Sequence, residues 1–258
     1  MNATVLSYDG GFEGFLCCVF AAYEQKLQPV KITAEDKAEA ELFADVHTIA
    51  TEPEKASRVW KAVESKASAK GKSALKMAFL SEQPGIELEL YSMIKYILKN
   101  EQPVDRDFSH PAVLKVSQVA RQVGREKHRM EAFVRFRLTK DEIYFAAIEP
   151  DFHVLPLLAG HFGKRYADQK WLIYDLKRQL GLFYDLEKME YVSLTLDPEI
   201  GIAGASEAFF HSSELQFQKL WQEYFKSVNI KSRANSKLHQ QHLPRRYWKY
   251  LTEKQPKL

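Results

Sequence analysis

The sequence predicts an α+β fold, in which a mainly antiparallel sheet with packed helices carries a helical insertion and a basic C-terminal extension. Through most of the first half, apolar residues recur at helical spacing. From Ala132 the period changes to two, so that alternate residues up to Leu138 would share one face of a strand. The chain has 258 residues, of which 45% are hydrophobic, so it is long enough for one large domain or two small ones and is not disordered by composition.

The first elements follow from local patterns. A short strand is expected at residues 4–8, and a glycine turn then leads into a helix that begins at Phe12. A second short strand is expected at residues 29–32. Thr33 with Asp36 resembles a capping box and predicts the start of a helical region.

The second half supplies most of the predicted sheet. The strand that begins at Ala132 is expected to pair with residues 143–148 in a hairpin, and a short helix follows around Leu158. Further elements are expected as three strands, at residues 170–174, 181–184 and 191–196, and a last helix that begins near Ser213.

The predicted domain organisation depends on the first strand. We expect residues 4–8 to join the sheet, which would give a core of residues 1–33 and 128–228. Residues 34–127 would then be a helical insertion, and residues 229–258 a basic aromatic C-terminal segment.

Charge is concentrated at the C-terminal end. Residues 225–258 hold nine Lys or Arg and a single acid, Glu253, which gives about +8, whereas the formal net charge of the whole chain is +3. Tyr247, Trp248 and Tyr250 lie among these cations. Phosphate binding needs positive charge and unstacked bases need aromatic platforms, so the pattern favours an anion or nucleic-acid surface. The alternative is a solvated, solubilising tail.

A second basic stretch surrounds the period change. Arg135 and Arg137 are expected on one strand face with Phe133, where guanidinium groups suit phosphate and the ring suits a base. The alternative interpretation is the solvated face of an antiparallel sheet.

Two groups of acidic residues are candidates for catalysis or metal binding. Glu149, Asp151 and His153 lie where a strand is expected to give way to a helix, and carboxylates with an imidazole can bind a metal or move a proton. Equally, Asp151 can cap the helix while His153 lies in a turn. Asp9 and Glu13 flank the first glycine turn, which lacks the features of a nucleotide-binding loop.

The cysteine and hydropathy patterns indicate in which cellular compartment the protein is expected. Cys17 and Cys18 are adjacent, so they are not expected to form an ordinary disulfide, and they are too few to hold an iron–sulfur cluster. The longest apolar run is too short to span a bilayer. We therefore expect a cytoplasmic, reduced protein that has no membrane contact and no cofactor of its own.

Four strings together resemble one bacterial family. They are YDGGFEGFLCCVFAAYE, HRMEAFVRFR, EPDFHVLPLLAGHFGKRYADQKWLIYD and SVNIKSRANSKLHQQHLPRRYWKYL. The family is of unknown function and its members are named probable DNA metabolism proteins. The resemblance implies a gene placed beside a putative DNA-repair protein of the radical SAM class, and related domains fused to uracil-DNA-glycosylase-like domains. It supplies no catalytic residues.

Together these observations favour a DNA-binding accessory component of a repair or base-modification system, which presents DNA to a radical SAM partner. Iron–sulfur cluster and SAM would belong to that partner. One alternative is a metal-assisted nuclease or glycosylase that uses Glu149, Asp151 and His153, and another is a protein-binding adaptor. The predicted nucleic-acid contacts are Arg135, Arg137, Lys231, Arg233, Lys237, Arg245, Arg246, Tyr247 and Trp248.

Overall fold

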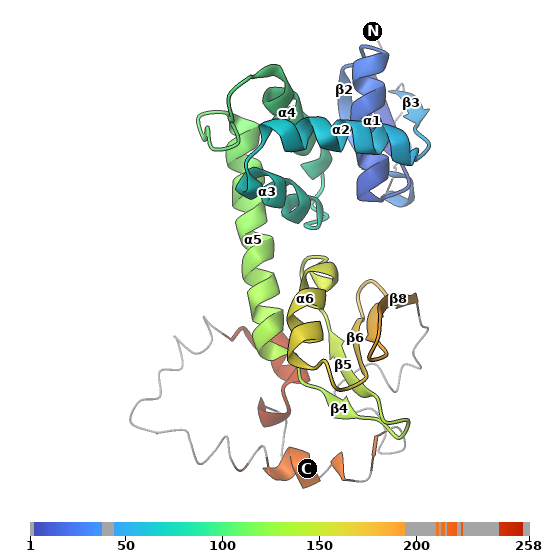
Figure 1. The fold of residues 1–258 in the computed structure, drawn as a ribbon, viewed down its shortest axis with the longest axis vertical. Coiled ribbons are helices and arrows are strands. Elements are labelled where there is room, and N and C mark those ends of the chain that lie inside the picture. The colour runs from blue at the N-terminus through green and yellow to red at the C-terminus, as the bar shows by residue number, and fades with distance from the viewer. Residues whose placement is uncertain are drawn as a thin grey trace. The chain divides into compact units, whose positions relative to one another are not determined.

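Two sheets, in different parts of the chain, organise the fold (Figure 1). The computed structural model describes residues 3–37, 44–193, 210–211, 213–214, 216–220, 223 and 243–254. These residues divide into two units, unit 1 from Met1 to Gly124 and unit 2 from Arg125 to Leu258. Helices and mainly antiparallel pairing in the second sheet confirm the predicted α+β class.

Unit 1 contains a parallel sheet of order β2-β1-β3. Its strands are β1 (Ala3–Tyr8), β2 (Pro29–Ala34) and β3 (Ala44–Thr48), and helix α1 (Phe12–Glu24) connects the first two. The prediction that the first strand joins the large sheet is wrong. β1 is buried continuously from Val5 to Tyr8, as is typical of a parallel strand that is covered on both faces.

The helices of unit 1 pack around one core and are not an insertion into unit 2. They are α2 (Pro53–Lys66), α3 (Ala69–Phe79), α4 (Ile86–Lys99) and the first part of α5 (Pro111–Phe133). A single cluster of buried side chains joins Leu6 of the sheet to Leu90 of α4 and Val116 of α5. The predicted insertion of residues 34–127 is therefore wrong, and the chain instead divides into two units after Gly124. The region after Thr33 also differs, because only Glu35–Lys37 form a short 3-10 turn and β3 follows.

The glycine turn at the start of α1 is closed by its own acid. One carboxylate oxygen of Asp9 accepts a hydrogen bond from the Gly11 N–H, and the other accepts one from the Thr51 hydroxyl. Cys17 and Cys18 are buried in α1. Burial raises the pKa of the Cys18 thiol to about 12, with smaller contributions from neighbouring acidic groups.

Helix α5 extends further than the sequence predicts. It continues to Phe133, whereas strand β4 is only Arg137–Leu138, so the predicted strand from Ala132 to Leu138 is wrong for residues 132–136. The guanidinium of Arg135 donates hydrogen bonds to the carbonyl oxygens of Ala132 and Val134. Because the last carbonyls of a helix lack internal partners, this side chain stabilises the end of α5.

The sheet of unit 2 has the order β4-β5-β6-β7-β8. β5 (Tyr144–Ile148) pairs antiparallel with β4, which confirms the predicted hairpin, and parallel with β6 (Trp171–Asp175) through helix α6 (Leu155–Arg165). β7 (Leu180–Tyr184) and β8 (Met189–Ser193) continue antiparallel.

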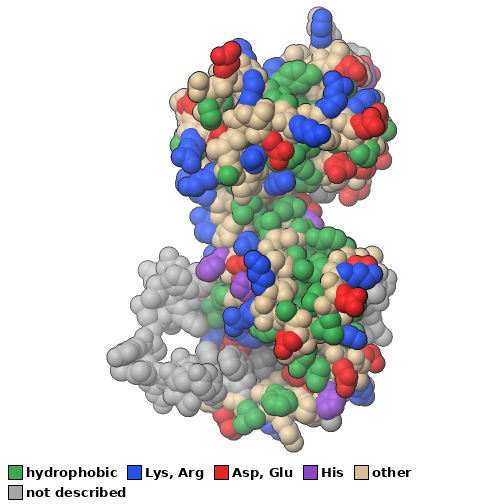
Figure 2. Space-filling model, viewed as in Figure 1, with side chains coloured by type: hydrophobic (Ala, Val, Ile, Leu, Met, Phe, Trp, Pro, Cys, Tyr) green, Lys and Arg blue, Asp and Glu red, His purple; other side chains and the backbone are tan. Residues whose placement is uncertain are grey.

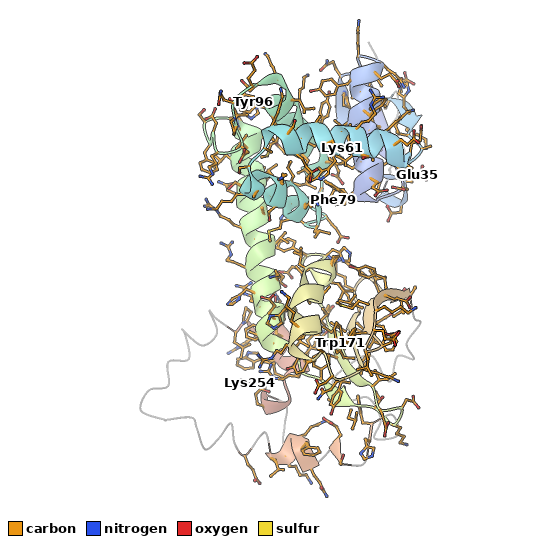
Figure 3. The ribbon with its side chains drawn as sticks, viewed as in Figure 1. Glu35, Lys61, Phe79, Tyr96, Trp171 and Lys254 are labelled. Carbon is orange, nitrogen blue, oxygen red and sulfur yellow. The ribbon has the colours of Figure 1, made fainter. Side chains whose placement is uncertain are left out.

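The C-terminal part of unit 2 is described for residues 243–254, with short 3-10 helices at Arg245–Tyr250 (η3) and Thr252–Lys254 (η4). The side chain of Trp171 lies inside unit 2, and Lys254 lies in η4 (Figure 3). In the described part of the chain, no helix is both long enough and apolar enough to cross a membrane.

Candidate nucleic-acid interface

Glu126 anchors the C-terminal segment to helix α5. Its carboxylate is almost fully buried, with 1% of the side chain exposed. It accepts hydrogen bonds from the Tyr247 hydroxyl, from the Arg246 guanidinium at 3.2 Å and from the backbone N–H of Asp151 at 3.0 Å. Arg129 forms a further ion pair with it at 3.4 Å. Since a buried charge is stable only when it is paired and hydrogen-bonded, Glu126 ties three segments of unit 2 together.

A second anchor lies where β5 ends. Glu149 accepts hydrogen bonds from the ammonium group of Lys249 and, at 2.7 Å, from the Tyr250 hydroxyl. The hydrogen bond from Lys249 is the main cause that lowers the pKa of Glu149, and the bond from Tyr250 adds to it. Asp151 pairs with Arg246 at 2.6 Å.

The two predicted sites therefore meet in one network. Asp151, one candidate catalytic acid, pairs with Arg246, which was predicted to contact DNA. Glu149, the other, pairs with Lys249, which lies three residues further along the same segment. His153 is half-buried in the same β5–α6 connection. Among the described residues, no group of three or more acids, histidines and cysteines is arranged to hold a metal. A catalytic role for Glu149, Asp151 and His153 stays a prediction.

The arginines near the period change are also engaged. Arg135 forms an ion pair with Glu253 at 2.9 Å, in addition to its carbonyl contacts. The guanidinium of Arg137 lies 3.9 Å from the ring centroid of Phe210, and burial lowers its pKa while Glu214 opposes the shift. The common open strand face that alternation predicts does not form, because Arg135 precedes the strand.

The 3-10 geometry of η3 places side chains three residues apart on the same side of the helix. With about three residues per turn, Arg246 and Lys249 share one side and Tyr247 and Tyr250 another. Both pairs bind the carboxylates of Glu126, Asp151 and Glu149.

The remaining side of η3 carries a cation and an indole. The exposed guanidinium of Arg245 lies 5.7 Å from the ring centroid of Trp248, and the Lys254 ammonium lies 5.3 Å from it. The indole N–H of Trp248 donates to the carbonyl oxygen of Leu243, which fixes the ring. Lys231, Arg233 and Lys237, the other predicted phosphate contacts, lie outside the described residues.

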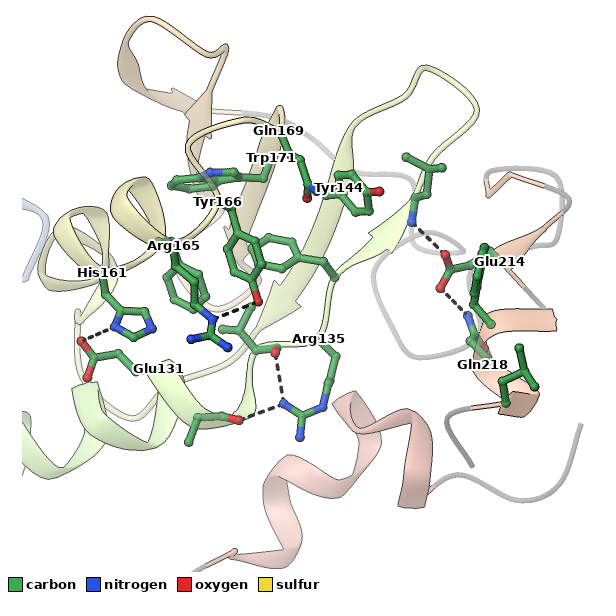
Figure 4. Close-up of a pocket in the computed structure, with 17 residues that line it drawn as sticks. Glu131, Arg135, Tyr144, His161, Arg165, Tyr166, Gln169, Trp171, Glu214 and Gln218 are labelled. Carbon is green, nitrogen blue, oxygen red and sulfur yellow. Dashed lines mark hydrogen bonds and ion pairs between the residues drawn. The ribbon is translucent and has the colours of Figure 1, made fainter. Parts of the chain in front are cut away.

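Unit 2 also contains a cavity of about 1060 Å³ that sequence patterns did not predict (Figure 4). It is lined by the end of α5, by α6 and by strands β4, β5 and β6, together with Glu214, Phe217, Gln218 and Leu220. The rings of Phe136, Phe162, Tyr166 and Trp171 form much of its wall, with centroid separations between 5.4 and 6.3 Å.

Polar side chains interrupt the aromatic wall. Figure 4 shows Glu131 of α5 facing His161 of α6, with 3.7 Å between the carboxylate oxygen and the ring nitrogen. Lys127 also pairs with Glu131, at 2.8 Å. Arg165 is exposed, and its Nε atom donates to the Tyr166 hydroxyl at 3.4 Å.

Comparison with known proteins places both features in one domain. The model of a family described as a domain of unknown function, DUF4130, matches residues 84–253. The chain belongs to this family. No curated protein matches the chain. One solved structure, a pGpG-specific phosphodiesterase (PggH) from Vibrio cholrae, is similar over 71% of this chain and 81% of that one, with 10% identity and a TM-score of 0.29. No fold or function is inferred from so low a score.

The DUF4130 match includes the whole cavity wall and the C-terminal anchors. The cavity was missed because its aromatic residues come from separate elements. One signal was present in the sequence, since Phe162, Tyr166 and Trp171 follow each other at intervals of four and five residues. On a helix end that leads into a strand, this spacing brings rings to one side.

Proposed function

We propose that this DUF4130 protein is a DNA-binding accessory component of a DNA repair or base-modification system, and that it presents DNA to a radical SAM partner. The partner would supply the iron–sulfur cluster and SAM. The resemblance of the four sequence strings to probable DNA metabolism proteins supports the assignment to DNA. The excess of cations in residues 225–258 supports phosphate binding.

The main support for the proposal is that the sides of η3 differ in what they contact. Two sides of η3 are bound by the carboxylates of Glu126, Asp151 and Glu149, and Arg245 and Trp248 share the third side. A fixed indole beside an exposed guanidinium suits a phosphate next to an unstacked base. On the face of unit 2 seen in Figure 2, Lys and Arg side chains lie among histidines, hydrophobic side chains and acidic side chains.

Adjacent arginines provide a matched test of this difference. Arg246→Gln removes a partner of Glu126 and Asp151, so we expect it to lower the free energy of unfolding by about 1–3 kcal/mol. Arg245→Gln removes the same charge from a side chain that has no carboxylate partner among the described residues, so we expect a stability change within about 0.5 kcal/mol. It should instead lower the salt slope of DNA binding by about one unit. Thermal unfolding and fluorescence anisotropy at several salt concentrations measure the two effects. Equal effects of both variants on both properties would contradict the proposal.

Trp248 is expected to contribute a base contact. Because stacking contributes about 1–3 kcal/mol per base, Trp248→Ala should weaken binding of single-stranded DNA more than binding of a duplex of the same length. The change also removes the hydrogen bond to Leu243, so the melting temperature is measured in parallel. A loss of stability without a preferential loss of single-strand affinity would assign Trp248 to packing alone.

The partner is tested by co-expression of the chain with a radical SAM protein of the kind that the family resemblance places beside it. We expect the two to co-purify and the complex to bind DNA more tightly than the partner alone. DNA binding by this chain without any retention of the partner would remove that part of the proposal.

A further inference from the structure

We propose that the cavity of unit 2 binds a single nucleobase that has been turned out of a DNA strand. This inference rests on the proposed function and names the chemical group that the DUF4130 domain would recognise. It assigns to the cavity a role separate from that of the Arg245 and Trp248 side of η3.

The wall of the cavity suits a flat aromatic ligand. Phe162 and Tyr166 lie parallel, at an interplanar angle of 11°, while Phe136 meets Tyr166 edge-on at 75°. Phe162 and Trp171 are buried and hold the set in place, whereas Phe136 and Tyr166 keep exposed surface. Every base has a π-face, so such rings can stack on any of the bases.

Two polar side chains of the wall have unused hydrogen-bonding capacity. Among the described residues, the structure gives no hydrogen bond to the Gln169 amide or the Tyr144 hydroxyl, both of which line the cavity and are labelled in Figure 4. An amide both donates and accepts, as the edge of a base does.

The charges around the cavity are compatible with a nucleotide. Its two carboxylates are already engaged, since Glu131 pairs with Lys127 and His161, and Glu214 accepts from the Leu138 N–H and from Gln218. The exposed guanidinium of Arg165 remains at the wall, where it can contact a phosphate. A volume of about 1060 Å³ admits a base with its sugar.

The test separates the base from its phosphates. Two oligonucleotides of equal length are compared, one composed of abasic residues throughout and one with a single central base. Every protein carries Trp248→Ala, so that the indole of η3 adds no stacking. We expect the chain to bind the base-containing strand about 5- to 150-fold more tightly than the abasic strand, with the same salt slope for both.

Substitutions in the cavity test whether the preference for the base-containing strand arises there. Gln169→Ala changes a side chain that makes no hydrogen bond within the described residues and should leave the fold intact. Tyr166→Leu removes the exposed ring and keeps an apolar filler. Both should reduce the preference at least severalfold, whereas Tyr191→Leu, at an exposed ring on β8 outside the cavity, should not. Hydrogen exchange of unit 2 confirms that each variant is folded.

Each result is decisive. Salt-dependent binding without a base preference, or a preference that survives both cavity variants, would overturn this inference and leave the proposed function standing. Absence of binding to either strand, by these variants and by the wild-type chain, would overturn both. Base preference that is lost in the two cavity variants and kept in Tyr191→Leu supports the site.

Discussion

Replacing Glu126 by alanine is expected to destabilise unit 2 by about 3–5 kcal/mol, because the carboxylate is buried and joins several partners. Its loss leaves Arg246 without one counter-charge and deprives the Tyr247 hydroxyl and the Asp151 N–H of their acceptor. Tyr247 is itself 2% exposed, so water does not readily replace the lost acceptor. Hydrogen exchange is the suitable measurement, because it reports unit 2 separately from unit 1.

Glu149→Ala is the matched control for this prediction. It removes an acid that also binds the C-terminal segment, but its side chain is 43% exposed. Exposed pairs contribute about 0–1 kcal/mol, so the loss should be small. If the two alanine variants destabilised unit 2 equally, Glu126 would not be the main anchor of residues 243–254.

The largest effect on DNA binding is expected from four substitutions made together, Lys231→Gln, Arg233→Gln, Lys237→Gln and Arg245→Gln. Arg245 is exposed, and Lys231, Arg233 and Lys237 lie outside the described residues, so thermal unfolding of the variant is measured in parallel. Each lost phosphate contact removes about 0.7 units of salt slope for a single strand. Four contacts together correspond to roughly a 10²- to 10³-fold loss of affinity at about 0.1 M salt.

A charge-matched control uses four exposed lysines of unit 1. The variant Lys61→Gln, Lys70→Gln, Lys99→Gln, Lys115→Gln lowers the net charge by the same amount at sites outside the C-terminal segment. We expect it to change affinity by much less than the C-terminal variant. An equal loss from both sets would show that only the net charge matters and would contradict a defined surface.

Local periodicity was sufficient for the elements with simple partners. Helix α1, strands β1 and β5 and helix α6 lie near their predicted positions, because each has a regular apolar pattern bounded by a turn. Alternation failed at residues 132–136, which precede strand β4. Although the sequence alternates there, helix α5, in which Glu126 and Met130 are buried, continues through Ala132 and Phe133.

The C-terminal segment shows what local patterns omit. Its charge and aromatic content were evident, but composition cannot distinguish an arginine that faces solvent from one that meets a distant carboxylate. Arg246 and Arg245 are neighbours in sequence, and only the former reaches Glu126, 120 residues away. The same limit applies to the cavity, whose wall is assembled from residues that lie far apart along the chain.

The central claim, that the chain itself binds DNA through its C-terminal cations, is tested most directly by a salt titration. The affinity of the purified wild-type chain for a single-stranded oligonucleotide of about 20 bases is measured between about 50 and 200 mM salt. We expect log affinity to fall linearly with log salt, and the four-residue C-terminal variant to reduce the slope by roughly three units. Absence of binding, or equal slopes for the wild type and this variant, would contradict the central claim.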